Sequence, residues 1–280
     1  MSRGRTPAAP GFGAAPRWAA APAFALLLAG LAACEAWVRP SREARIAAAE
    51  AGAAHFAGRL DGLRRSVFIV LSGDGDEPPV LVARGGRVEV DAGAGPRTSA
   101  LACGVAGDGY LLTAAHVLGR HNWVLGWMGG ALGIRPARVV ERRDYGAPGA
   151  EFAVLRVGAP LDSPLPPAEQ GGAAGEIYAM AAERGAGGGI ECLAGRAVGY
   201  SGAAGGGACL VLRAEMPTGH GDSGGPVLTP DGALIGVDIG WEVAAPHPRP
   251  VRTVCCPNPA VIRAIIERDR LGHPREVPPP

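Results

Sequence analysis

The sequence lacks the concentrated positive charge that marks nucleic-acid-binding proteins. Its 27 basic residues are almost matched by 26 acidic residues, which leaves a formal net charge of +1. Its basic runs do not go beyond the pairs Arg64-Arg65 and Arg142-Arg143. Because nucleic-acid-binding surfaces need clustered Lys and Arg, we expect no nucleic-acid partner.

The cysteine spacing that is typical of zinc sites is also missing. None of the six cysteines belongs to a Cys-x-x-Cys pair or to a Cys/His cluster. Structural zinc sites are built from such groups. We therefore expect no metal ion and no cofactor. Aromatic residues are scarce too, at 5%, which carries no information about the chemistry of the protein.

Glycine and proline are abundant instead. The 280 residues include 45 Gly and 26 Pro, and many short apolar runs lie between them. This pattern favours strands and turns over long helices. A chain of this length can form one large domain or two small ones, each with a real hydrophobic core.

The N-terminal segment, residues 1–34, is predicted to be a targeting sequence. Several arginines precede an uncharged apolar stretch from Trp18 to Ala33, as in signal peptides. The stretch ends in Leu-Ala-Ala-Cys, which resembles the bacterial lipobox, with Cys34 as the residue that is lipidated.

Three interpretations of this segment remain open: a lipoprotein anchor, an uncleaved single-span anchor and a plain secretory signal. The apolar stretch is shorter than the ~20 residues that a spanning helix usually needs. All three interpretations place the rest of the chain outside the cytoplasm. We expect a membrane-anchored protein of the bacterial cell envelope that faces the periplasm or the exterior.

Five cysteines remain beyond Cys34, and an exported protein can form disulfides. Their odd number leaves at least one thiol unpaired or shared between chains. Cys192 and Cys209 lie on neighbouring strand-like stretches and are the first pair expected, although connectivity cannot be deduced from sequence. The other three are Cys103, Cys255 and Cys256.

The pattern of the chain changes at about residue 66. Residues 35–65 are Ala-rich and charged, with good helix propensity, and are predicted to be a helical spacer between the anchor and the following domain. From residue 66 onward, short strand-like runs alternate with Gly, Asp and Pro. The runs in the first half are 67–71, 80–82, 87–90, 100–103, 109–113, 137–140 and 152–157, and those in the second half are 177–180, 194–198, 209–213, 226–228 and 233–237.

Residues 221–226, Gly-Asp-Ser-Gly-Gly-Pro, are the most informative motif of the sequence. A serine hydroxyl becomes a nucleophile when a base removes its proton and hydrogen-bond donors stabilise the oxyanion that forms. The glycines around Ser223 allow a tight loop that points backbone amides at one spot. His116, in the motif Thr-Ala-Ala-His that follows a strand-like run, is the candidate base.

Each motif also has an alternative interpretation. The serine motif could be a surface turn, and His116 could be a core histidine. Gly-x-Ser-x-Gly is also the nucleophile elbow of α/β-hydrolases. That fold requires a helix directly after the serine, which Pro226 disfavours. It also places the histidine after the serine, which leaves only His247 or His273 in Pro-rich surroundings.

Together the two motifs resemble the trypsin-like serine peptidases, and more closely their bacterial branch that includes the HtrA-type proteases. The resemblance implies an all-β fold over residues 66–271, with two six-stranded antiparallel barrels at about 66–158 and 172–256. Residues 257–271 resemble the C-terminal helix that this family packs against its second barrel. No segment of PDZ length follows, and the tail of residues 272–280 is predicted to be disordered.

The resemblance also implies the roles of the site residues. Ser223 would attack the scissile carbonyl, and His116 would take its proton and return it to the leaving amine. The amides of Gly221 and Ser223 would form the oxyanion hole. Asp222 would be structural, with its carboxylate tied up within the loop.

The carboxylate that orients the histidine departs from the family pattern. The family usually has Asp-x-Ala-Leu-Leu on the strand concerned, whereas this sequence has Glu-Phe-Ala-Val-Leu at residues 151–155. Glu151 can hold the imidazole tautomer as aspartate does. Asp144, in the preceding loop, is its rival. A third possibility is that no carboxylate serves and that the enzyme is slow or inactive.

The resemblance predicts a substrate pocket lined by Pro217, Thr218 and Trp241. Pro217 stands six residues before Ser223, where relatives specific for basic side chains have an aspartate, so a preference for Lys or Arg is disfavoured. Asp238 could reverse this argument if the register differs. Trp241 could narrow the pocket or belong to the core, and His220 is expected at the cleft rim.

The function predicted from these features is an envelope-anchored serine endopeptidase that acts on proteins or peptides. Two alternatives remain: a catalytically impaired trypsin-like domain that binds polypeptides, and an esterase on the same fold. Glu151 in place of aspartate is the feature that favours the first alternative.

Overall fold

The computed structural model describes residues 41–84, 87–91, 98–146, 150–168, 175–182, 189–242 and 251–272. The predicted targeting segment of residues 1–34, with its candidate lipidation site Cys34, lies outside the described residues. The same holds for the first residues of the predicted spacer and for nearly all of the predicted C-terminal tail.

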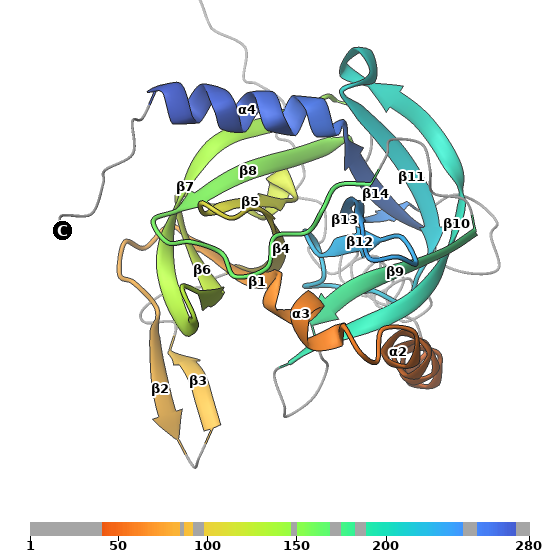
Figure 1. Ribbon diagram of the computed structural model, residues 1–280, viewed down its shortest axis with the longest axis horizontal. Helices are drawn as coiled ribbons and strands as arrows, with labels where there is room; N and C mark the ends of the chain where they lie inside the picture. Colours follow the sequence, from red (N-terminus) through yellow and green to blue (C-terminus); the bar gives the residue numbers. More distant parts are fainter. Residues whose placement is uncertain are drawn as a thin grey trace, which may run out of the picture. The chain divides into compact units, whose positions relative to one another are not determined.

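Two closed antiparallel barrels of six strands each form the body of the molecule (Figure 1), as the sequence predicted. Most of their strands are short apolar runs that Gly, Pro and Asp separate, with buried inward-facing side chains. The two longest strands, Ala131–Asp144 and Ile190–Ala204, are mostly exposed or half-buried. The first barrel has the order β1 (Val67–Gly73), β4 (Thr98–Ala106), β5 (Tyr110–Thr113), β8 (Glu151–Val157), β7 (Ala131–Asp144) and β6 (His121–Met128). The second has the order β10 (Ile190–Ala204), β11 (Cys209–Glu215), β14 (Val251–Pro257), β13 (Leu234–Glu242), β12 (Pro226–Leu228) and β9 (Gly175–Ala182).

The hydrophobic core includes a separate cluster inside each barrel and a larger one that joins them. Phe68, Val124 and Leu155 belong to the first barrel's cluster. The larger cluster takes residues from both barrels and from the C-terminal helix; its members include Leu101, Phe152, Met180, Val237 and Ile265. The two barrels therefore pack on each other through apolar side chains.

Two of the predicted strands do not belong to the first barrel. The runs at 80–82 and 87–90 form a separate two-stranded sheet, β2 (Val80–Arg84) and β3 (Arg87–Asp91), that projects away from the barrel in Figure 1. Val80 is about half exposed in it. The barrel is completed instead by β6, and the second barrel by β14, neither of which the run pattern predicted. A hairpin and a barrel strand have the same local alternation, so only the long-range pairing separates them.

The chain before the first barrel forms two helices, α2 (Arg42–His55) and α3 (Leu60–Arg65). Ser41 caps α2, because its hydroxyl accepts a hydrogen bond from the Ala44 amide at 3.1 Å. Helix α2 packs along β10 of the second barrel, and Phe56, which follows it, is buried against Tyr178. Among the described helices, none has both the length and the apolar character needed to cross a bilayer.

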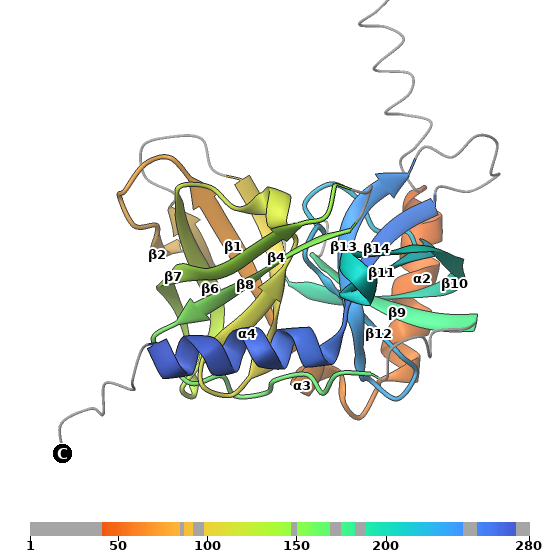
Figure 2. The ribbon, with the colours of Figure 1, turned by 90° about the horizontal axis from the view of Figure 1, so that it is seen from above.

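The C-terminal helix α4 (Pro259–Gly272) confirms the predicted element. Asn258 caps it by accepting a hydrogen bond from the Ala260 amide at 2.9 Å. The helix extends along the first barrel and contacts β7 (Figure 2), whereas the resemblance implied that it packs against the second barrel. Asp269 contributes to this placement, because Tyr110, Arg138 and Arg156, which donate hydrogen bonds to it, belong to the first barrel.

Asp269 is 8% exposed and accepts hydrogen bonds from Tyr110 Oη at 2.9 Å, Arg138 Nη2 at 2.8 Å and Arg156 Nη1 at 3.3 Å. Burial acts to raise the pKa of this carboxyl, but the hydrogen bonds from Arg138 and Tyr110 outweigh it and hold the pKa below its usual range. The carboxylate therefore fixes the last turns of α4 to the first barrel.

We expect Asp269→Asn to lower the free energy of unfolding by roughly 2–3 kcal/mol, because two guanidinium groups lose their ionic partner. The contribution of Asp269 is present above its unfolded pKa of ~3.9 and is lost as the pH falls through the lower folded value. Urea unfolding at pH 7 and at pH 3 measures both effects. Glu267→Gln, on the exposed side of the same helix, is the control. Equal losses for the two variants would contradict this role.

The structure pairs Cys209 with Cys255 in a disulfide between β11 and β14. The expected pair Cys192–Cys209 is therefore wrong. Cys192 faces helix α2 instead and is a free, buried thiol, as are Cys103 and Cys256. Burial raises the pKa of the Cys192 and Cys256 thiols to about 12, so neither forms an appreciable thiolate at neutral pH.

Candidate active site

The buried strand β5 leads into a single 3₁₀ turn, η1 (Ala115–Val117), that presents His116. Ala115 and Val117 are buried, whereas 45% of the His116 side chain is exposed. Strand β5 pairs with β8 so that Thr113 lies opposite Ala153. The chain beyond Thr113 therefore passes the start of β8, where Glu151 lies.

Glu151 is the carboxylate that the structure brings to His116. Its Oε1 is hydrogen-bonded to His116 Nδ1, and its side chain is mostly buried. Asp144, the rival, accepts a hydrogen bond from the Gly146 amide at 2.9 Å and stabilises the turn after β7. Because a bond at Nδ1 fixes the tautomer of the ring, it leaves Nε2 as the nitrogen that can accept a proton.

Ser223 lies in a loop that both barrels hold. Its carbonyl oxygen accepts a hydrogen bond from the Leu101 amide of β4 at 2.8 Å, and the Gly224 amide donates to the Asp238 carbonyl of β13 at 2.7 Å. The Ser223 hydroxyl donates to the Ile239 carbonyl at 3.3 Å. Within the described part of the chain, no hydrogen bond joins Ser223 to His116.

Gly221 and Gly224 give the loop its shape, since both have positive φ, +90° and +82°. Gly224 also approaches β4 so closely that a Cβ there would lie 2.0 Å from the Leu101 carbonyl oxygen. No described residue accepts a hydrogen bond from the amides of Gly221 or Ser223. These two amides, predicted to form an oxyanion hole, are therefore available to a ligand.

Asp222, between those two amides, points into the protein and is 2% exposed. Its carboxylate accepts hydrogen bonds from the amides of Gly219 at 2.6 Å and Ala182 at 3.0 Å. A guanidinium nitrogen of Arg45, from helix α2, donates to it at 3.0 Å. The prediction that this carboxylate is tied up within the loop is confirmed, and its bonds extend beyond the loop.

The residues predicted to line the substrate pocket differ from one another in burial and in contacts. Thr218 is buried, and the Pro217 carbonyl accepts a hydrogen bond from Arg45 at 3.0 Å. The backbone of Trp241 belongs to β13, while its side chain lies outside the described atoms. His220 is exposed.

The carboxylate of Asp238 is buried and paired, so a substrate side chain cannot reach it. It is 1% exposed, and Arg252 donates to both of its carboxylate oxygens, at 3.2 and 2.8 Å. The structure therefore gives no support to the idea that Asp238 selects basic side chains.

Sequence reasoning missed Arg45, Leu101 and Thr113. Thr113 Oγ1 donates to the Leu101 carbonyl of β4 at 2.6 Å. Leu101 in turn donates its amide to the Ser223 carbonyl, so it lies between the histidine strand and the serine loop. Thr113 lies within the motif around His116, so the signal was present. Arg45 has no sequence signal, because a charge in an Ala-rich helix is usually solvated. Among the described residues, no three His, Cys, Asp or Glu side chains cluster as metal ligands would.

Comparison with known proteins agrees with this architecture. Residues 101–237 match the family model described as trypsin-like peptidase domain. No curated protein matches the sequence.

Several solved structures share the fold. The Rv3671c protease from M. tuberculosis, in its active form, has a TM-score of 0.52 at 18% identity, with 77% of this chain and 85% of that one covered. The serine endoprotease from Yersinia pestis has a TM-score of 0.52 at 16% identity, with 76% and 65% covered. Deg5 has a TM-score of 0.52 at 15% identity, with 75% and 91% covered. By its sequence over residues 101–237 and by its double-barrel fold, this protein carries a trypsin-like peptidase domain.

Proposed function

We propose that this protein is a serine endopeptidase that hydrolyses peptide bonds in proteins or peptides. Ser223 acts as the nucleophile, His116 as the general base and Glu151 as the carboxylate that orients the imidazole. The observation that carries the proposal is the hydrogen bond between Glu151 and His116 Nδ1, which leaves Nε2 free to accept a proton. The Gly221 and Ser223 amides stabilise the oxyanion of the tetrahedral intermediate. The predicted N-terminal anchor supports action outside the cytoplasm, at the cell envelope.

The mechanism has four steps that these groups can perform. His116 removes the Ser223 proton as the hydroxyl oxygen attacks the carbonyl carbon of the substrate. Imidazolium, stabilised by Glu151, then gives that proton to the leaving amine. Water then attacks the acyl-enzyme while His116 removes a proton from it. His116 returns this proton to the Ser223 oxygen as the acid product leaves.

Labelling of the purified full-length chain with a fluorophosphonate tests the nucleophile directly. We expect the wild type to be labelled, and Ser223→Ala to remain unlabelled while folded. Asp144→Asn is the control, because that carboxylate serves a turn. Turnover of peptides as well as esters would distinguish a peptidase from an esterase on the same fold.

One observation favours a second candidate function. The Ser223 hydroxyl donates to the Ile239 carbonyl, and no described hydrogen bond joins it to His116. A catalytically impaired domain that binds polypeptides in its cleft has the same features. A folded wild type that the fluorophosphonate does not label, but that binds unfolded polypeptide, would establish this alternative.

A further inference from the structure

Arg45 is a buried charge on a helix whose other charged side chains are exposed or partly exposed. It is 7% exposed, and it comes from α2, which precedes both barrels in the sequence. A buried guanidinium needs ionic and hydrogen-bond partners to offset its lost hydration. Among the described residues, the guanidinium of Arg45 contacts strands β9 and β10 and the loop between β11 and β12, all of them in the second barrel.

The partners of Arg45 bracket the loop that carries Ser223. One nitrogen, Nη1, donates to the Pro217 carbonyl and to Asp222 Oδ2, each at 3.0 Å. Nη2 donates to the Ala182 carbonyl at 2.7 Å, and Glu191 forms the second ion pair. The guanidinium therefore joins the beginning of the loop, at Pro217, to the residue directly before Ser223.

Asp222 connects these contacts to the candidate oxyanion hole. Its side chain is fixed by Arg45 and by the Gly219 and Ala182 amides, and its own peptide groups are flanked by the Gly221 and Ser223 amides. The Ser223 amide belongs to the peptide group that follows Asp222, so rotation about the Asp222 backbone changes its direction. The Gly221 amide belongs to the peptide group between His220 and Gly221, so the same rotation changes its position relative to the Ser223 amide. Oxyanion stabilisation depends on donors held at about 2.7–3.1 Å from the developing charge, so small rotations have large effects.

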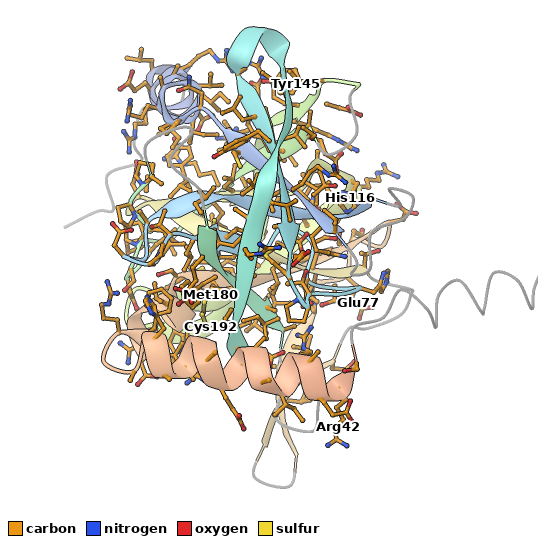
Figure 3. The ribbon with its side chains drawn as sticks, turned by 90° about the vertical axis from the view of Figure 1, so that its right-hand side faces the viewer. Arg42, Glu77, His116, Tyr145, Met180 and Cys192 are labelled. Carbon is orange, nitrogen blue, oxygen red and sulfur yellow. A yellow bond between two sulfur atoms is a disulfide. The ribbon has the colours of Figure 1, made fainter. Side chains whose placement is uncertain are left out.

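Helix α2 is held close to the second barrel along its length. A Cβ added at Gly52 would lie 2.2 Å from the Cys192 carbonyl oxygen, so the helix touches β10 there. His55 stacks on Tyr178 at 4.3 Å and contacts the Pro230 carbonyl at 2.7 Å. Arg45 is thus placed by a docked helix and not by a free side chain. Figure 3 shows α2 lying crosswise to the strands beside Cys192, with Arg42 pointing away from the barrel.

We propose that Arg45 is a positioning residue for the oxyanion-binding amides, and that docking of α2 is required for full activity. The proposal rests on the proposed peptidase function for its kinetic consequence. Residues 42–55 would then contribute to activity, in addition to separating the predicted anchor from the barrels. Arg45 acts through Asp222 and touches no substrate.

Kinetics of Arg45→Met separate positioning from mere stabilisation. Methionine keeps most of the buried aliphatic volume but removes the donors. We expect kcat on an ester substrate to fall by about 10²-fold, as when an oxyanion donor is lost or displaced, while KM changes little. Arg45→Lys should recover part of kcat, since it keeps one charged donor. Arg42→Met, on the exposed side of α2, is the control. Thermal unfolding checks that each variant is folded at the assay temperature.

A second variant leaves the guanidinium intact. Gly52→Ala should push α2 away from β10 and lower kcat in the same direction as Arg45→Met. Gly62→Ala, in α3, is its matched control, because a Cβ there meets nothing within 4 Å. Folded Arg45→Met and Gly52→Ala enzymes with wild-type kcat would overturn the proposal.

Hydrogen–deuterium exchange gives a readout that does not depend on activity. In a Ser223→Ala background, Arg45→Met should speed exchange in a peptide covering residues 216–225, whose Gly219, Asp222, Gly224 and Gly225 amides are hydrogen-bonded. If Arg45→Met speeds exchange while the wild type shows no peptidase activity, the proposed peptidase function is disproved. The coupling between Arg45 and the loop is supported in that case. Unchanged exchange in this peptide would disprove the coupling whatever the activity.

Discussion

Replacement of Glu151 with glutamine is expected to lower kcat by roughly 10⁴-fold, with little effect on KM. The amide can donate a hydrogen bond to Nδ1, which favours the tautomer that has its proton on Nε2. That tautomer cannot accept the Ser223 proton. The amide also lacks the negative charge that stabilises imidazolium. Steady-state kinetics on an ester and a peptide substrate measure the loss.

Asp144→Asn is the matched control for this prediction, because Asp144 lies opposite Glu151 in the β7–β8 ladder, yet the hydrogen bond that its side chain accepts comes from the Gly146 amide of its own turn. We expect it to change kcat by no more than about twofold, as for most surface substitutions. Glu151→Asp keeps the negative charge but has a side chain that is one methylene shorter. We expect its kcat to lie between those of Glu151→Gln and Asp144→Asn. A large loss in Asp144→Asn with none in Glu151→Gln would assign the role to Asp144.

Gly224→Ala is expected to destabilise the protein by roughly 3–5 kcal/mol, the combined cost of a left-handed backbone and of overpacking. A Cβ at this position would lie 2.0 Å from the Leu101 carbonyl oxygen and 2.3 Å from Thr113 Oγ1. Relief of that contact must separate the Ser223 loop from β4. We therefore expect a Tm lowered by about 10 °C, together with loss of fluorophosphonate labelling.

Gly130→Ala isolates the contribution of the backbone. Its φ of +80° nearly equals that of Gly224, but a Cβ there meets nothing within 4 Å. We expect Gly130→Ala to lower the free energy of unfolding by only about 1–2 kcal/mol and the variant to retain activity. If both variants lose the same stability, the close approach of Gly224 to β4 is not what constrains this position.

The sequence allowed the parts of the site that depend on short motifs to be predicted. The glycines around Ser223 set a loop by their own conformational freedom. Glu151 was a candidate because it stands where the family motif has an aspartate, although the sequence left Asp144 as a rival. The short apolar runs indicated strands, and the resemblance to the trypsin-like family implied that they form two barrels.

What could not be predicted depends on contacts between distant parts of the chain. Arg45 is indistinguishable in sequence from the solvated charges around it, and its burial is decided by Asp222 and Glu191. The Cys209–Cys255 pair depends on β11 lying beside β14, a strand that the run pattern did not indicate. The β2–β3 hairpin has the same alternation as a barrel strand.

The docking of α2 also orders events in time. Arg45 leaves the ribosome 177 residues before Asp222, an interval of about 10–35 s at ~5–20 residues per second. A 14-residue helix is marginal in isolation, so α2 becomes persistent only when the second barrel exists to receive it. Under the proposed function, the catalytic site is therefore completed only after the chain has been synthesised past Asp222. We expect a nascent chain to hydrolyse no peptide bond before Arg45 can contact Asp222.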